Sequence, residues 1–312
     1  MDRREFLRMI GALGAAGAAR ILLGPGRGPP PLWAESSALP VAPKSPDLVA
    51  VKGGGQAARL DRALREYGGM GAFVRRGQTV VIKPNIGWSQ EPRVAATTNP
   101  ELVKRLVEQC LEAGAKKVWV FDHSCDNGPA SYRTSLIESY AKEGGAAVVP
   151  GDNSSSYQEV SIPGAVSLKR TRVHGLILEA DVFINVPVLK DHSGAGMTCA
   201  MKNLMGIAWD RGDFHQLGLD QCIADIGLFR KPALNIVDAG KVMLTGGPRG
   251  HAGSRYDEQR MLILSPNIVA IDAVGAKTLG RSPADFGYIA AAEERGLGAA
   301  DLSKLDIRRL TI

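Results

Sequence analysis

The sequence predicts an α/β fold, in which a mostly parallel, doubly wound sheet has helices on both faces and carries a small β-hairpin insertion. Two observations predict it. From residue 48 onward, β-branched and apolar runs alternate with helical segments, the rhythm of parallel strands joined by crossover helices. The exception is 159–173, where polar and apolar residues alternate on both sides of Pro163-Gly164, a pattern that indicates a hairpin.

Local signals support the individual elements of a single α/β domain over 48–312. In the clearest case a helix with Gly114 just beyond its end has two possible starts: Asn99 can cap it with Pro100 at its first position, or Thr98 and Glu101 can form a capping box. The expected strands are 48–52, 79–83, 117–122, 146–150, 176–185, 233–238, 260–264 and 305–310. The expected helices are 56–67, 99–113, 131–143, 197–207, 213–229, 267–279 and 283–295.

Residues 1–38 have the pattern of a twin-arginine signal peptide, and 39–47 form a linker to the domain. Residues 3–7 read RREFL, and the apolar run 9–19 is too short to span a bilayer of ~30 Å as a helix. A small-residue cleavage site, SSA, follows at 36–38. We therefore expect export in the folded state by the twin-arginine translocation machinery, to a periplasmic or otherwise extracytoplasmic location. No membrane span is expected in the mature chain.

Net charge and cysteine pattern exclude several classes of protein. The 312-residue chain carries +6, and loss of the five arginines and three acidic residues of the signal segment leaves +4. This charge is mild, and no dense Lys/Arg run contains interleaved aromatics, so nucleic acid is not an expected partner. Cys110, Cys125, Cys199 and Cys222 form no C-x-x-C pair, so no iron–sulfur cluster motif is encoded and the cofactor, if any, is unknown.

One stretch, 184–209, combines a strand, a glycine-broken loop and an apolar helix. It reads INVPVLKDHSGAGMTCAMKNLMGIAW, and its loop carries Lys190 and His192. In the helix that follows, only Lys202 and Asn203 are strongly polar. Because a buried ammonium loses its hydration, a lysine there needs a partner or a route to water. The stretch therefore predicts a site for an anion or a polar cofactor.

Other polar residues stand at the ends of expected parallel strands, where ligands bind in open α/β sheets. Lys83 ends one expected strand and Asn85 follows it, and Asp122 ends the next. Asp238 ends a later strand, before a glycine-rich loop. We expect these strand ends and the Lys190 loop to converge on one basic cleft.

The residue types suggest roles within this cleft. Histidine titrates near neutrality, so His192 or His215 would transfer a proton. Lys190, in the same loop as His192, is placed with them among the catalytic residues. Thr198 and Lys202, four residues apart, would share a helix face and hold an anion together with free backbone N–H groups. Two alternatives stay open: the histidines can be structural, and Lys202 can pair with a buried acid such as Asp225 or Asp238. The expected ligand-binding residues are Lys83, Asn85, Asp122, Thr198, Lys202, Asn203 and Asp238.

A metal site is a further alternative. The run DHSCD at 122–126 contains every ligand type that a transition metal would use, but adjacent residues of an extended chain point in different directions. His192 and His215 could also be metal ligands. The metal therefore stays unknown.

Several of these segments together resemble the domain of unknown function 362 family. They are VVIKPNIG (80–87), ATTNPELVKRLVE (96–108), ADVFINVPVLKDHSGAGMTCAMKNLMGI (180–207), NIVDA (235–239), GGPRG (246–250) and VAIDAVGAK (269–277). The likeness runs over 49–298. Some members carry a ferredoxin segment, whose cysteines this chain lacks, and the resemblance implies no role for any individual residue. The residues at motif positions are Lys83, Asn85, Asn99, Asp122, Lys190, His192, Thr198, Lys202, Asn203, His215, Asp238 and Asp272.

Three functions fit the sequence. The first is an exported enzyme, of which a redox-associated one is a special case, with a Lys/His cleft for a small anionic ligand or cofactor. The second is a periplasmic ligand-binding or accessory protein that uses the same cleft without turnover. The third is a metal-dependent enzyme that uses His192 and His215.

Overall fold

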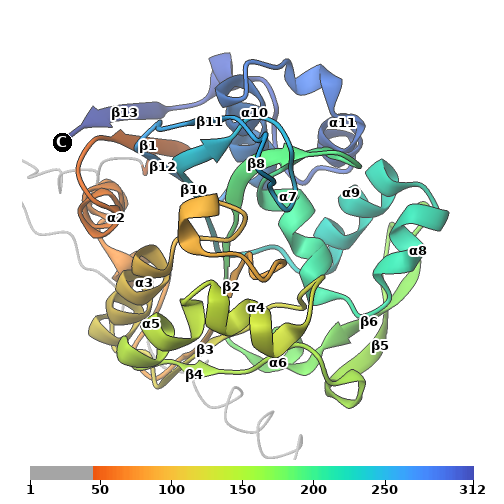
Figure 1. The fold of residues 1–312 in the computed structure, drawn as a ribbon, viewed down its shortest axis with the longest axis horizontal. Coiled ribbons are helices and arrows are strands. Elements are labelled where there is room, and N and C mark those ends of the chain that lie inside the picture. Colours follow the sequence, from red (N-terminus) through yellow and green to blue (C-terminus); the bar gives the residue numbers. More distant parts are fainter. Residues whose placement is uncertain (1–44) are drawn as a thin grey trace, which may run out of the picture. The chain divides into compact units, whose positions relative to one another are not determined.

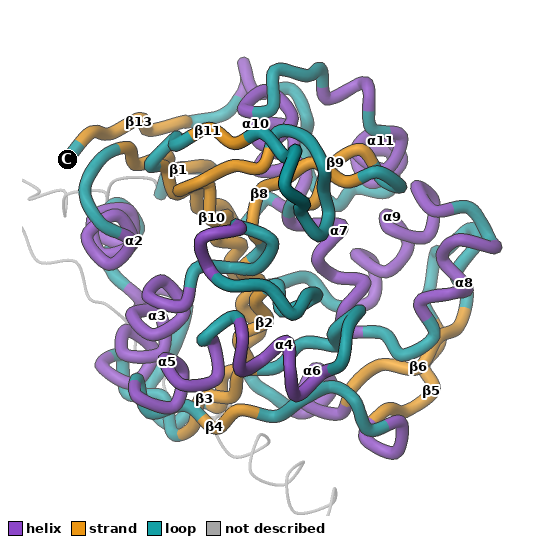
Figure 2. The backbone as a smooth tube through the Cα atoms, in the orientation of Figure 1, coloured by secondary structure: helices purple, strands orange, loops and turns teal. Residues whose placement is uncertain are grey.

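The computed structural model describes residues 45–312, so the expected signal peptide 1–38 and most of the linker lie outside the described residues. Figures 1 and 2 show helices packed around one sheet. The strands of this sheet are β1 Leu48–Lys52, β2 Thr79–Pro84, β3 Lys117–Val120, β4 Ala147–Val148, β7 Val182–Val186, β8 Val188–His192, β9 Gly196–Thr198, β10 Leu234–Met243, β11 Tyr256–Asp257, β12 Met261–Ser265 and β13 Ile307–Thr311. The helices are α2 Gln56–Arg65, α3 Pro100–Glu112, α4 Gly128–Thr134, α5 Ile137–Glu143, α6 Gly175–Glu179, α7 Ala200–Asn203, α8 Arg211–Gln216, α9 Leu219–Phe229, α10 Ile268–Thr278 and α11 Gly287–Glu294.

The sheet is mostly parallel, as predicted. Its order is β13-β1-β12-β10-β7-β2-β3-β4, with β8, β9 and β11 attached to β10 or to each other. Strand β2 pairs in parallel with β3 and β7, β3 with β4, β7 with β10, and β1 with β13. Strand β12 is antiparallel to both of its neighbours, β1 and β10.

Helices cover both faces of the sheet, which confirms the doubly wound prediction (Figure 1). Alternate residues of β2 show the division: Val80 and Ile82 belong to one buried apolar cluster and Val81 to another. The first cluster includes residues of α2, α3, α4 and α5. The second includes residues of α7, α9, α10 and α11. Both faces of the strands are therefore buried, which explains their continuous apolar sequences.

The hairpin predicted over 159–173 is also present as an insertion. β5 Tyr157–Ser161 and β6 Arg170–His174 form a separate two-stranded antiparallel sheet. No helix of residues 45–312 has the length and apolarity needed to cross a membrane.

Two predicted helices are divided: 131–143 is α4 and α5, and 213–229 is α8 and α9, with Leu136 and Gly218 at positive φ between them. Two further predicted elements have the wrong secondary structure. The expected strand 176–185 begins as α6, whose first turn is capped by the His174 Nδ1 atom, which accepts from Leu176 N at 3.1 Å; the strand starts only at Val182. The expected helix 197–207 is a short strand, β9, followed by the single turn α7 and the 3₁₀ turn Leu204–Ile207. Pairing of Thr198 with Lys190 across β8 and β9 overrides the local apolar pattern.

Candidate functional site

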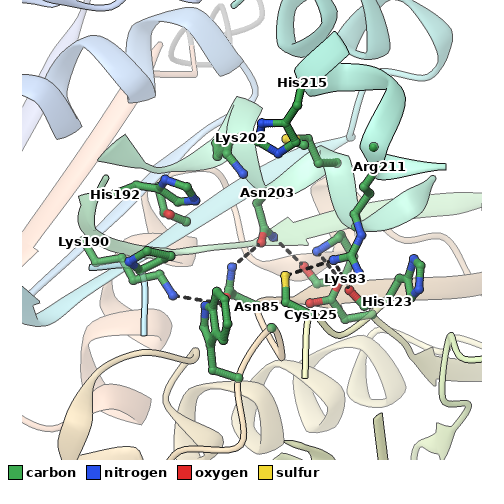
Figure 3. Close-up of a pocket in the computed structure, with 18 residues that line it drawn as sticks. Lys83, Asn85, His123, Cys125, Lys190, His192, Lys202, Asn203, Arg211 and His215 are labelled. Carbon is green, nitrogen blue, oxygen red and sulfur yellow. Dashed lines mark hydrogen bonds and ion pairs between the residues drawn. The ribbon is translucent and has the colours of Figure 1, made fainter. Parts of the chain in front are cut away.

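A cavity of about 350 Å³ lies at the carboxyl ends of β2 and β3 and beside β8 and α7 (Figure 3). Nine of the ten predicted site residues line it: Lys83, Asn85, Asp122, Lys190, His192, Thr198, Lys202, Asn203 and His215. They come from separate segments between residues 83 and 215, which the parallel sheet brings to one edge.

The structure does not bring Asp238 into this cavity. β10 continues for five residues beyond Asp238, so this aspartate lies inside a strand rather than at its end. Its carboxylate accepts from Gln56 Nε2 at 2.9 Å, from Asn99 N at 2.9 Å and from Gly240 N at 3.0 Å. Asp238 therefore anchors the start of α3 to the sheet.

Lys83 and Asp122 form a buried ion pair in the wall of the cavity. The Lys83 Nζ atom lies 2.6 Å from Asp122 Oδ1, and both side chains are almost fully buried. Lys83 also donates to Pro84 O at 2.9 Å, and Asp122 Oδ2 accepts from Ile86 N at 2.7 Å. Burial lowers the pKa of Lys83, and Asp122 partly opposes this effect. The pair leaves no net charge for a ligand.

Gly206 is required for this ion pair to fit. A Cβ atom at this position would lie 2.1 Å from Asp122 Oδ1 and 2.8 Å from Lys83 Nζ. Contacts of this length are sterically excluded, and both neighbours are held by their own hydrogen bonds. The glycine therefore lets the chain after α7 approach the two charges closely.

Lys190 is the most deeply buried cation without a carboxylate partner at the cavity. It is 1% exposed, and its Nζ atom donates to Ala96 O and, at 3.5 Å, to Asn85 Oδ1. The ion pairs of residues 45–312 do not include it. Burial is the main cause that lowers the pKa of Lys190 to about 7, and Lys202 and Lys83 add repulsion.

Lys202 is likewise without a hydrogen bond or ion pair in the described part of the chain. Burial lowers its pKa to about 8, and the neighbouring Arg211 and Lys83 contribute to the shift. The pairing with Asp225 or Asp238 that the sequence left open does not form: Asp225 instead accepts from Val166, Ser167 and Leu168 backbone N–H groups and from Gln221. The Lys202 ammonium is therefore available to a ligand.

His192 is neutral and its tautomer is set by the backbone. Its Nδ1 atom accepts from Gly194 N at 3.0 Å and Ala195 N at 3.2 Å, which leaves the proton on Nε2. Burial and the charges of Lys202 and Lys190 lower the pKa of His192 to about 3. At neutral pH it is therefore a hydrogen-bond donor rather than a base. Figure 3 shows the Lys202 ammonium drawn between the rings of His192 and the exposed His215.

A chain of four asparagines runs from the cavity into the sheet. Asn85 Nδ2 donates to Asn203 Oδ1 at 3.0 Å, and Asn203 Nδ2 donates to Asn185 Oδ1 at 2.9 Å. Asn185 Nδ2 donates to Asn235 Oδ1 at 3.0 Å, and Asn235 Nδ2 to the carbonyl of Ser265 at 3.2 Å. The amides all point the same way, so the Oδ1 atom of Asn85 is the acceptor that meets Lys190.

The prediction that the N-terminus of a helix binds the anion is wrong. The first free N–H groups of α7, those of Ala200 and Met201, donate to the buried carboxylate of Asp272 at 2.6 and 3.2 Å. Thr198 belongs to β9 and not to the helix, so it does not share a helix face with Lys202. The role of Asp272 is to hold the turn that carries Lys202.

Sequence reasoning missed Arg211, which closes one side of the cavity. Its guanidinium donates to His123 O at 3.0 Å, to Ser124 O at 2.6 Å and to the exposed Cys125 Sγ at 3.1 Å. Its partners are mostly backbone carbonyls, which carry no sequence signal. Trp88 and Pro248 also line the cavity.

Side chains of the run 122–126 make other contacts in the structure. The rings of His123 and Trp209 are stacked with centroids 4.8 Å apart, and His123 Nδ1 bonds Ala208 O at 3.0 Å. Burial is the main cause that lowers the pKa of His123. Across residues 45–312 no group of three or more His, Cys, Asp or Glu side chains is placed to hold a metal ion. The cavity is instead rich in cations, with Asp122 as its one lining carboxylate among the described residues.

Comparison with known proteins agrees with the resemblance noted above. A curated relative, the thylakoid-associated protein sll1697 of Synechocystis sp., is 30% identical over 268 residues, which are 79% of this chain and 77% of that protein. The lactate racemase apoprotein of Thermoanaerobacterium thermosaccharolyticum is similar with a TM-score of 0.40 at 14% identity, over 68% of this chain and 54% of that one. A protein of Thermotoga maritima is similar with a TM-score of 0.39 at 13% identity, over 60% of this chain and 50% of that one. This chain thus spans about half the length of the solved structures it matches. The sequence pattern of the domain of unknown function (DUF362) matches residues 80–277, and the chain belongs to this family.

Proposed function

We propose that this protein is an exported enzyme that binds a small organic anion in the basic cavity. One observation carries the proposal: Lys190 and Lys202 line the same cavity, and neither has a carboxylate partner in the part of the chain that the structure describes. Two desolvated cations destabilise the empty site, and an anion that enters it removes part of this cost.

The charge and size of the cavity support a ligand of this class. The Lys83–Asp122 pair is neutral as a unit, so Lys202 and Arg211 supply the excess positive charge, to which Lys190 adds only in its protonated form. A volume of about 350 Å³ lies near the lower end of the range for small-molecule sites, about 300–1,000 Å³. A carboxylate or phosphate group on a small molecule fits both properties.

The protonation states of Lys190 and His192 favour an enzyme over a protein that only binds its ligand. The pKa of Lys190 is lowered to about 7, so this lysine can both accept and donate a proton near neutral pH. His192 offers a fixed Nε2–H donor beside it. A passive binding site gains nothing from a cation that is half neutral at pH 7, whereas a proton-transfer site does.

Binding of small anions tests the proposal. Malonate, oxalate, phosphate and pyruvate would be titrated into the purified protein by calorimetry and followed by thermal shift. We expect at least one to bind and to raise the melting temperature, and Lys202→Met to weaken its binding at least tenfold while leaving the protein folded. Lys169→Met, at an exposed position outside the cavity, is the matched control and should bind normally. Equal affinity in the wild type and Lys202→Met would contradict the proposal.

Export is proposed from the RREFL motif alone. Replacement of Arg3 and Arg4 by lysines should retain the protein in the cytoplasm, measured by cell fractionation. An unchanged extracytoplasmic fraction would argue against the twin-arginine route.

A further inference from the structure

Lys190 has the surroundings of a neutral amine rather than of an ammonium ion. Its 1% exposed side chain lines the cavity, and its Nζ atom has two acceptors, Ala96 O and Asn85 Oδ1. A neutral lysine amine has two N–H donors and one lone pair. Two acceptors therefore satisfy both donors and leave the lone pair for whatever occupies the cavity.

The orientation of Asn85 makes this arrangement specific. Its amide nitrogen is committed to Asn203 Oδ1, so only its oxygen can face Lys190. The hydrogen-bond partners of the amine are thus neutral oxygens. Among the nearby charges, Lys202 and Lys83 repel its charged form, whereas Asp122 and Cys125 favour it, and burial outweighs them. A lysine that is desolvated next to other cations is a known means of producing a nucleophilic amine at neutral pH.

We propose that Lys190 is a nucleophile that forms a Schiff base with the carbonyl carbon of a small oxo acid. This inference rests on the proposed anion-binding function and names the substrate class. The Nζ lone pair adds to the carbonyl carbon, and the carbonyl oxygen takes up the two amine protons. Loss of this oxygen as water leaves a C=N bond, so one carbonyl and one amine give one imine and one water. The imine nitrogen takes a proton from solvent to become an iminium.

The other lining groups fit the remaining parts of such a substrate. The unpaired Lys202 ammonium can receive the carboxylate, because it has no competing partner in the described residues. The Nε2–H of His192 can donate to the oxygen that leaves, since the Nδ1 atom is held by Gly194 and Ala195. Arg211 is less suited to direct binding because its guanidinium already donates to two carbonyls and to Cys125.

The acidity of Lys190 agrees with this role. A lysine of ordinary pKa 10.5 is neutral in roughly one molecule in three thousand at pH 7, whereas one with a pKa of about 7 is neutral in about half. The rate of adduct formation should therefore increase from pH 6 to pH 8 and then level off.

Reductive trapping tests the inference. The full chain would be incubated with glyoxylate, pyruvate or 2-oxoglutarate, reduced with sodium cyanoborohydride and analysed by intact mass and peptide mapping. We expect one reduced adduct per chain, located on Lys190, in the wild type and in Lys169→Met. Lys190→Met should abolish this adduct. Malonate, which has carboxylates but no ketone or aldehyde carbonyl, should protect Lys190 in the wild type, a measurement that needs no variant.

The outcomes separate this inference from the function on which it rests. If oxo acids and malonate stabilise the protein but no adduct forms on Lys190, or adducts are spread over surface lysines, the Schiff base is overturned and anion binding stands. If none of these anions binds, both are overturned. An adduct on Lys190 whose rate does not change between pH 6 and pH 8 would overturn the assignment of a neutral amine.

Discussion

Replacing Lys190 by methionine should stabilise the protein, and by an amount that depends on pH. Methionine keeps most of the length of the side chain but has no charge to desolvate. The lowering of the pKa of Lys190 from 10.5 to about 7 corresponds to an upper limit of about 5 kcal/mol of destabilisation at low pH. The variant also loses the hydrogen bonds to Ala96 and Asn85, which reduces its gain in stability by about 1–3 kcal/mol. The net expectation at pH 6 is a gain of about 2–4 kcal/mol in the free energy of unfolding.

The pH dependence follows from the number of protons that each state binds. Between pH 7 and pH 10.5 the unfolded chain holds a proton on Lys190 that the folded chain has lost. The wild type therefore becomes more stable as pH rises through this window, by up to ~1.4 kcal/mol per pH unit. Methionine removes this dependence. The advantage of the variant should shrink by about 3 kcal/mol between pH 6 and pH 9.5.

Urea denaturation of the wild type and Lys190→Met, followed by circular dichroism at several pH values, measures the effect. Lys169→Met serves as the control, and its difference from the wild type should stay within about 0.5 kcal/mol throughout. Parallel pH curves for the wild type and Lys190→Met would refute the reasoning. So would a variant that is several kcal/mol less stable at every pH, because that result would mean that Lys190 is a paired and charged residue.

Three other expectations follow from the described contacts. Gly206→Ala should lower the free energy of unfolding by about 3–5 kcal/mol, because its Cβ would break the buried ion pair of Asp122. Gly212→Ala is the control: its Cβ meets nothing within 4 Å, so it should change the free energy by less than about 1 kcal/mol. Equal losses of stability in urea denaturation would contradict this expectation. Iodoacetamide should alkylate the exposed Cys125 far faster than the three buried cysteines, and peptide mapping that found equal rates would count against the structure. Burial raises the pKa of Asp272 to about 7, so the folded state binds more protons than the unfolded state between pH 4 and pH 7 and loses stability as pH rises. Asp272→Asn should flatten this slope, and an unchanged slope would show that another group causes it.

Much of the fold could be predicted because its strands are continuous apolar runs. β2, for example, was expected at 79–83 and occupies Thr79–Pro84. The failures occur where an apolar run is compatible with two structures. Leu176 to Leu178 satisfies either a strand or a helix, and the His174 side chain decides for a helix by capping it. In 196–198 the decision comes from pairing with β8, a tertiary contact that local periodicity does not encode.

The place of the candidate site could be predicted because parallel strands share one carboxyl edge. Lys83, Asp122 and Lys190 follow from this rule. Asp238 does not, because the length of β10 is set by its pairing with β12 and β11 and not by its own sequence. Arg211 was not predicted because two of its partners are backbone carbonyls of a distant loop. The protonation states depend on burial, which no linear motif specifies.

The four-asparagine chain means that the polarity of the cavity is decided at points that no ligand reaches. A backbone carbonyl can only accept, so Ser265 O fixes which way Asn235 is turned and Ala200 O fixes Asn185. The amide nitrogen of Asn203 is held by Asn185 Oδ1 and by the carbonyls of Lys83 and Pro84, and Asn203 in turn fixes Asn85. Loss of one of these contacts would leave the others to hold the oxygen of Asn85 towards Lys190. The acceptor that Lys190 meets is thus determined by the buried backbone and not by the cavity itself.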